Sequence, residues 1–219
     1  MDRIRRLLLA ACAVFVAAGG AAQDTGVAER PPLHRAAFFG DLEAARVLLD
    51  GGAATSATLE DGTTALHLAA LRGHTEVVEL LIERGSGLEV DARPEGTALH
   101  AAARRGQVAS AQALLRAGAD VEAQNESGDR PLHRAARLGR VGVVRVLLDA
   151  DAEIDARGKR RTTPLHIAVD ANHADVVVLL VERGANVNYR DRRGDTPLRR
   201  ARRLSHSEIV DYLREHGGR

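Results

Sequence analysis

Apolar residues recur along this chain at the spacing of an α-helix, in short stretches that each end at a glycine. Residues 61–93 show the pattern most clearly, because two apolar helix faces follow one another there: Leu66, Ala69 and Ala70, and then Val77, Val78, Leu81 and Ile82. Gly73 and Gly85 follow the two stretches, and glycine commonly ends a helix in the left-handed conformation. Thr64 can cap the first stretch, since its hydroxyl accepts from N–H groups of the first turn. The segment therefore predicts a pair of short helices that follows a turn at Asp61-Gly62.

The same pattern occurs six times with a constant step of 33 residues. The start of each first helix carries a near copy of one motif: Pro31-Pro32-Leu33-His34, Thr64-Ala65-Leu66-His67, Thr97-Ala98-Leu99-His100, Arg130-Pro131-Leu132-His133, Thr163-Pro164-Leu165-His166 and Thr196-Pro197-Leu198. Arg199 takes the place of the histidine in the sixth copy. A fixed period of this size indicates a stacked array of repeats, in which each repeat contacts only its neighbours.

On these motifs the chain resembles the ankyrin-repeat family over residues 28–219. The resemblance implies an all-α solenoid of six helix-turn-helix units joined by short β-hairpin-like turns, and we expect it to be a monomer. The repeats are expected at 28–60, 61–93, 94–126, 127–159, 160–192 and 193–219, the last of which ends early. The aromatic content of 2% suits such a fold, because its core is a stack of Ala and Leu layers.

Departures from the repeat pattern bear on the expected structure. Asn172 stands where glycine usually closes a first helix, and asparagine tolerates that conformation. Asp151 replaces a glycine that closes a second helix, which should cost a little stability. Repeat six has Arg214 where Ile82 packs in repeat two, and its first helix is crowded with arginines: Arg199, Arg200, Arg202 and Arg203. Terminal repeats need a polar outer face, so repeat six is expected to be a C-terminal cap.

Residues 1–22 precede the array and have the three-part plan of a secretory signal peptide. A basic start with three arginines is followed by an apolar run at 7–18 and then by small residues. Cleavage after Ala18 and cleavage after Ala22 both suit this pattern, and residues 23–27 would form a short lead. The apolar run is short for a permanent anchor, so no stable membrane span is expected.

Cys12 is the only cysteine, and cleavage would leave a mature protein without a thiol. Disulfides, thiol catalysis and cysteine-ligated zinc would then be excluded. Leu9-Ala10-Ala11-Cys12 resembles a bacterial lipoprotein processing box, so lipid anchoring through Cys12 is an alternative, as is an uncleaved, membrane-anchored start. The Ala- and Arg-rich composition and the short signal indicate a bacterial protein that is periplasmic or secreted.

The repeated histidines do not predict a metal site. They would be spaced by about 10 Å if neighbouring helices pack at ordinary distances, whereas zinc ligands lie about 2.0–2.1 Å from one centre. The ankyrin resemblance implies a structural role, in which each histidine bonds the capping Thr and the backbone of the next repeat. His74 and His173 share another repeat position and receive the same structural interpretation.

The sequence predicts no catalytic residue, no cofactor-binding residue and no metal ligand. It has no Gly-rich loop that opens a helix in phosphate-binding fashion and no H-E-x-x-H motif. Most carboxylates fall at helix or turn positions that we expect to be exposed. We therefore expect a protein that is not an enzyme and carries no cofactor.

The ankyrin resemblance implies that the functional surface is a concave groove, built from the hairpin tips and the exposed ends of the first helices. The first-helix ends contribute Phe38, Phe39, Leu71, Arg72, Arg104, Arg105, Arg137 and Leu138. The tips contribute Glu60, Asp61, Thr63, Arg93, Glu126, Asp129, Lys159, Arg160, Thr162, Arg192 and Arg193. The first-helix ends, with Lys159 and Arg160, are the partner-binding candidates, because aromatic and Arg side chains most often anchor interfaces. Phe38 and Phe39 have an alternative role as a cover for the open N-terminal end of the stack.

Charge is distributed unevenly along the chain. Residues 23–126 carry 16 acidic and 9 basic side chains, a net −7, and residues 127–219 carry 13 acidic and 19 basic, a net +6. The basic half can attract an acidic protein surface, or alternatively nucleic acid or an anionic membrane surface, or it can serve only as a solubilising face of the C-terminal cap. Its only aromatic residues are Tyr189 and Tyr212, too few to stack bases, so no nucleic-acid partner is expected.

These observations favour a non-enzymatic scaffold that binds a partner protein on its concave face, in the bacterial periplasm. The alternative is a secreted effector or inhibitor that acts on a host or competitor protein. The repeated motifs belong to the frame and cannot name the partner.

Overall fold

The computed structural model describes residues 30–219. The predicted signal peptide at 1–22, the lead at 23–27 and Cys12 lie outside the described residues. Within 30–219 the chain forms twelve α-helices and one 3₁₀ turn, η2 (Lys159–Arg161). The first helices of the repeats are α2 (Pro32–Phe39), α4 (Ala65–Arg72), α6 (Ala98–Arg105), α8 (Pro131–Arg137), α10 (Pro164–Asp170) and α12 (Pro197–Arg203). The second helices are α3 (Leu42–Asp50), α5 (Thr75–Glu83), α7 (Val108–Arg116), α9 (Val141–Asp149), α11 (Ala174–Glu182) and α13 (Ser207–Glu215).

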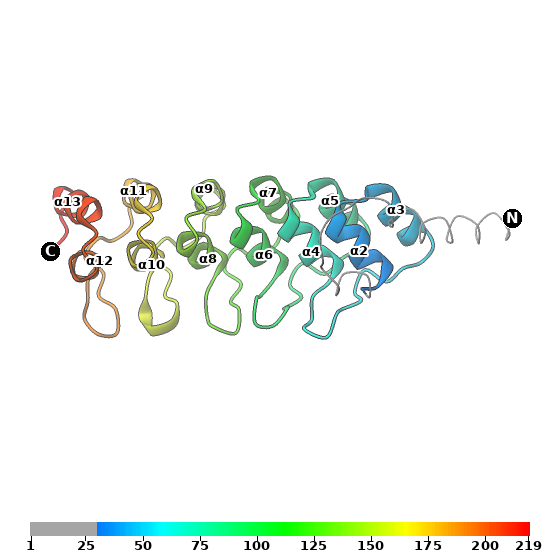
Figure 1. Cartoon of the computed structure of the whole chain (residues 1–219), viewed down its shortest axis with the longest axis horizontal. Coiled ribbons are helices and arrows are strands. Elements are labelled where there is room, and N and C mark those ends of the chain that lie inside the picture. The colour runs from blue at the N-terminus through cyan, green and yellow to red at the C-terminus, as the bar shows by residue number, and fades with distance from the viewer. Residues whose placement is uncertain (1–29) are drawn as a thin grey trace, which may run out of the picture.

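The helices form two parallel rows in an elongated stack. Each first helix packs on the next first helix, and each second helix on the next second helix. The loops between repeats project from the row of first helices, on the side away from the second helices (Figure 1). In the described residues no extended strand occurs, and isolated β-bridges join only Thr58 to Thr64 and Ala92 to Gly96. The expected all-α solenoid of six helix-turn-helix units is confirmed.

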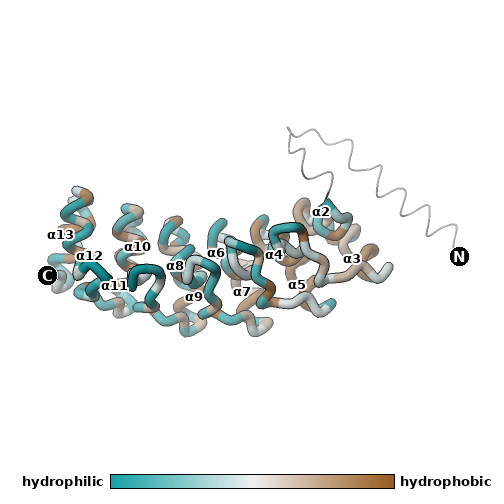
Figure 2. Tube along the Cα trace, turned by 90° about the horizontal axis from the view of Figure 1, so that it is seen from below, coloured by the Kyte–Doolittle hydropathy of each residue, from teal (hydrophilic) through white to brown (hydrophobic). Residues whose placement is uncertain are grey.

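The core is a ladder of leucines that repeats with the period of the sequence. One leucine in each of the first helices α4 to α12 is no more than 1% exposed: Leu66, Leu99, Leu132, Leu165 and Leu198. The second helices α5 to α13 add fully buried Leu81, Leu114, Leu147, Leu180 and Leu213. Alanines such as Ala69 and Ala102 separate the leucines and let neighbouring helices approach closely. In the hydropathy view the apolar segments alternate with polar ones along the whole stack (Figure 2).

The motif histidines bond neighbouring repeats to one another. The N–H of Thr64 donates to His67 Nδ1 (3.3 Å), and His67 Nε2 donates to the carbonyl of Gly96 in the next repeat (3.1 Å). His100 and His166 reach the following repeat in the same way, whereas His133 Nε2 donates to the carbonyl of Ala156 near the end of its own repeat. Burial is the largest cause that lowers their pKa, so the neutral ring fills both roles. The implied role, a bond to the capping Thr and one to the next repeat, is confirmed for His67, His100 and His166, whereas His133 bonds the N–H of Arg130 and a carbonyl of its own repeat.

Helix ends follow the pattern expected from the sequence. Gly73 has φ 79°, and Asn172 and Asp151 adopt the same left-handed conformation with φ 58° and 61°. After the first helices α4, α6, α8 and α10 a side chain also bonds back to the preceding repeat. His74 Nε2 donates to the carbonyl of Phe38 and His173 Nε2 to that of Arg137, both at 3.1 Å. The structural interpretation of these two histidines is therefore confirmed.

Candidate functional site

The candidate surface is the inner face formed by the projecting inter-repeat tips and the C-terminal ends of the first helices. We call this face the groove. All ten partner-binding candidates lie at the protein surface. Four are half-buried: Phe38, Leu71, Arg104 and Leu138. The other six are exposed: Phe39, Arg72, Arg105, Arg137, Lys159 and Arg160. The first helices follow one another along the stack (Figure 1), and the candidates on them occupy two adjacent repeat positions at the helix ends.

The two phenylalanines at the N-terminal end of the groove differ in their surroundings. Phe38 lies between two guanidinium groups, with Arg72 4.0 Å and Arg30 4.8 Å from the ring centroid. Cation–π contacts of this kind hold the ring in place. Phe39 meets the Phe38 ring edge-on at 5.2 Å between centroids and is 53% exposed. Phe38 thus has partners in its own chain, and Phe39 offers apolar surface to solvent.

Two of the arginine candidates are held by carboxylates of the same chain. Arg104 contacts Glu95 at 3.1 Å, and Arg134 shares that carboxylate at 2.6 Å. Arg137 contacts Asp129 at 2.8 Å, and the Asp129 side chain is only 5% exposed. The expectation of an exposed Asp129 at a tip is therefore wrong, because its carboxylate turns inward to meet an arginine. Arg105 and Arg72 have no carboxylate partner within residues 30–219, so they are the more available arginines at the first-helix ends.

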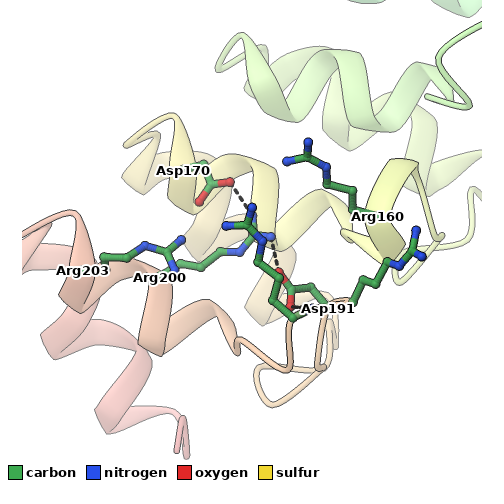
Figure 3. A pocket seen from close by; sticks show the side chains of 7 residues that line it. Arg160, Asp170, Asp191, Arg200 and Arg203 are labelled. Atoms are coloured by element: carbon green, nitrogen blue, oxygen red, sulfur yellow. Dashed lines mark hydrogen bonds and ion pairs between the residues drawn. The ribbon is translucent and has the colours of Figure 1, made fainter.

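The arginine-rich first helix of repeat six is not simply a solvated cap face. Arg199, Arg202 and Arg203 are exposed, but Arg200 is buried between Asp170 of repeat five and Asp191 of the preceding tip (Figure 3). Asp195, also buried, receives Arg199 at 3.0 Å and Arg203 at 2.6 Å. The assumption that most carboxylates are solvated thus fails at these positions. The sequence contains a signal for these ion pairs, because Asp129–Arg137 and Asp195–Arg203 have the same spacing and the same repeat position.

The charge state of this cluster follows from its contacts. Burial acts to raise the pKa of Asp191. Hydrogen bonds from the Arg200 guanidinium and from the N–H groups of Asp195 and Arg193 outweigh it and lower the pKa to about 2. Asp191 is therefore ionised at neutral pH, and the Arg200 guanidinium between the two carboxylates stabilises that charge.

A cleft of about 480 Å³ lies in the groove between the last two tips and the helices α10 and α12. We call it the arginine cleft, and its lining residues are Arg160, Asp170, Asp191, Arg192, Arg193, Arg200 and Arg203. Figure 3 shows Arg200 between its two carboxylates on one wall and Arg160 extending from the tip of repeat five on the other. Arg160, Arg192 and Arg193 are predicted tip residues, but the sequence pattern does not bring them together with the helix residues.

No group of three or more His, Cys, Asp or Glu side chains in residues 30–219 is placed to hold a metal ion. No helix in this part of the chain has the length and apolar character needed to cross a bilayer.

Family models of ankyrin repeats match most of the chain. A three-copy ankyrin model matches residues 6–93, 33–125 and 87–158, and a many-copy ankyrin model matches residues 147–201. No curated protein sequence matches the chain significantly.

Solved structures agree with the family models. The ankyrin repeat domain of human ASB11 is 31% identical with a TM-score of 0.80, and the match covers 87% of this chain and 85% of that one. The ankyrin repeat domain of Bcl-3, a member of the IkappaB family, is 32% identical with a TM-score of 0.79, over 87% of this chain and 88% of that one. The chain therefore belongs to the ankyrin-repeat family, whose repeats are in general non-enzymatic scaffolds for protein–protein interaction.

Proposed function

We propose that this protein is an interaction scaffold in the bacterial periplasm and binds a partner protein in its groove. The observation that carries the proposal is Phe39, the most exposed of the large apolar side chains in the described residues, at the N-terminal end of the groove. It occupies the same repeat position as Arg72 and Arg105, which have no carboxylate partner within residues 30–219. An exposed aromatic ring beside available guanidinium groups is a typical composition for an interface anchor.

The frame supports this role because it is already ordered. The motif histidines and leucines that build the stack are buried. The groove side chains therefore project from fixed helix ends, and a partner would bind with little loss of conformational entropy in this protein. The proposal includes export directed by residues 1–22. A mature protein that begins after Ala18 or Ala22 would support export. A mature protein that begins at Cys12 would indicate lipid anchoring.

The test compares two matched double variants in living cells. Phe39→Ala with Arg105→Ala removes one apolar and one basic side chain from the groove. Val47→Ala with Arg145→Ala removes the same kinds of exposed side chain from the second helices α3 and α9. Arg104 and Arg137 stay intact, because their loss would leave Glu95 and Asp129 without a partner and confuse binding with stability.

The expected result is that crosslinking and mass spectrometry recover a partner with the parent and with the second-helix variant, and lose it with the groove variant. Circular dichroism should be the same for all three. Undiminished recovery with the groove variant would show that the groove is not the binding face. Recovery of the protein from culture supernatant, and not from periplasmic extract, would favour the secreted effector or inhibitor.

A further inference from the structure

The tips of the last two repeats differ in charge from the tips before them. In the middle of the stack, basic and acidic tip residues neutralise one another, as Arg93 does with Glu126 (3.4 Å) and Asp91 (3.7 Å). The arginine cleft has Arg160 from one tip and Arg192 and Arg193 from the next, all exposed. None of these three forms an ion pair with a carboxylate within residues 30–219.

The two carboxylates in the cleft do not neutralise these arginines. Asp170 and Asp191 both accept hydrogen bonds from Arg200. Arg203, the fifth arginine of the lining, contacts Asp195 at 2.6 Å. Five guanidinium groups and two carboxylates give the lining a net charge of +3. Positive charge gathered in a cleft concentrates the field and attracts anions.

The backbone at the tip of repeat five is left-handed at two arginines. Arg160 and Arg161 have φ 62° and 60°, in the left-handed region. The equivalent positions to Arg161 hold Gly62, Gly128 and Gly194 in three other repeats, with φ between 72° and 82°. A residue with a side chain is disfavoured in this conformation. The Arg160 side chain from this tip lines the cleft.

We propose that the arginine cleft binds two neighbouring carboxylates on an acidic segment of the partner protein. The inference rests on the proposed function and adds the chemistry of one contact. Guanidinium groups bind carboxylates through paired, charge-assisted hydrogen bonds, and the Arg200 guanidinium already bonds two carboxylates in this cleft. The cleft volume of about 480 Å³ is in the range of roughly 300–1,000 Å³ that is usual for ligand sites.

Carboxylates fit the cleft better than phosphate groups do. Asp170 and Asp191 line the same cleft and repel any anion that enters it. A carboxylate carries one negative charge and a phosphate group nearly two, so the repulsion from these two residues is smaller for the carboxylate. An acidic segment can also place its second charge farther from them.

The test measures binding of a fluorescent hexaglutamate peptide to the full-length protein by anisotropy, with hexaglutamine as the neutral peptide. The site variant is Arg160→Gln with Arg192→Gln and Arg193→Gln. The control variant, Arg46→Gln with Arg145→Gln and Arg214→Gln, removes three exposed arginines from second helices and changes the net charge equally. The parent and the control should bind hexaglutamate alike. The affinity of the site variant should be lower by a factor of about ten or more.

Three results of the peptide experiment would overturn the inference. The first is a parent that binds hexaglutamate no better than hexaglutamine, and the second is an equal loss of binding in both variants. The third is displacement of hexaglutamate by inorganic phosphate at concentrations where acetate has no effect, which would assign the cleft to phosphate. If the site variant still captures the cellular partner and the Phe39/Arg105 variant does not, the inference fails and the proposed function stands. If neither variant loses the partner, both fail.

Discussion

The stability of this protein should fall steeply when the pH is lowered below about 6.5, because five histidines are buried as neutral rings. They are His34, His67, His100, His133 and His166, and none is more than 4% exposed. Burial is the largest cause that lowers each pKa from the ordinary value of 6.5. In the unfolded chain the rings titrate near 6.5, so below that pH the unfolded state binds more protons than the folded one.

The magnitude follows from the number of rings. One proton taken up only by the unfolded state changes the free energy of unfolding by about 1.4 kcal/mol per pH unit. Near pH 5.5 an unfolded histidine is about 90% protonated, so a folded ring that stays fully neutral contributes at most about 1.2 kcal/mol per pH unit. Five rings give at most about 6 kcal/mol per pH unit. Asp155, whose pKa is raised by burial, acts in the opposite direction, but it is one group against five.

The assay is urea unfolding followed by circular dichroism between about pH 7.5 and pH 5.5. The double variant His100→Gln with His133→Gln should lower the upper limit of the slope from about 6 to about 3.6 kcal/mol per pH unit, since three rings remain. Leu99→Ala is the control: Leu99 is 1% exposed and carries no proton, so its loss lowers stability without changing the slope. A parent slope below about 1 kcal/mol per pH unit, or an unchanged slope in the double variant, would refute the reasoning.

Three further predictions concern single positions. Arg161→Gly should raise the free energy of unfolding by about 1 kcal/mol by relieving the left-handed strain, and Arg161→Gln should not; thermal unfolding distinguishes them. Arg200→Ala should cost about 3–5 kcal/mol because it leaves a buried carboxylate unpaired, whereas Arg199→Ala, from a side chain 71% exposed, should cost less than about 1 kcal/mol in urea unfolding. Gly139→Ala should destabilise more than Gly128→Ala, since both have positive φ but only the first Cβ would meet a neighbouring ring, at 2.7 Å; equal losses of Tm would contradict this.

The structure also gives a physical reason for the sequence motif. His67 bonds Thr64 in its own repeat and Gly96 in the next. The same two bonds recur at His166, with Thr163 and Asp195 as partners. One side chain thus links helix capping to repeat stacking.

The sequence by itself determined the frame of this protein. The helix pairs are predicted from the 33-residue period, the apolar helix faces and the residues that end each helix. Asn172 and Asp151 also adopt the left-handed conformation that these helix-end positions require. These features depend on contacts within one repeat or between identical positions of neighbouring repeats, so a period in the sequence is enough to reveal them.

The tertiary structure decided how the variable side chains combine. Arg200 meets Asp170 from the preceding repeat and Asp191 from the adjoining tip, and only the folded stack brings these three together. The arginine cleft arises in the same way, from two tips and two helices. A period fixes where each Cα lies but not which neighbour a long charged side chain reaches, because that choice depends on the packing of three elements at once.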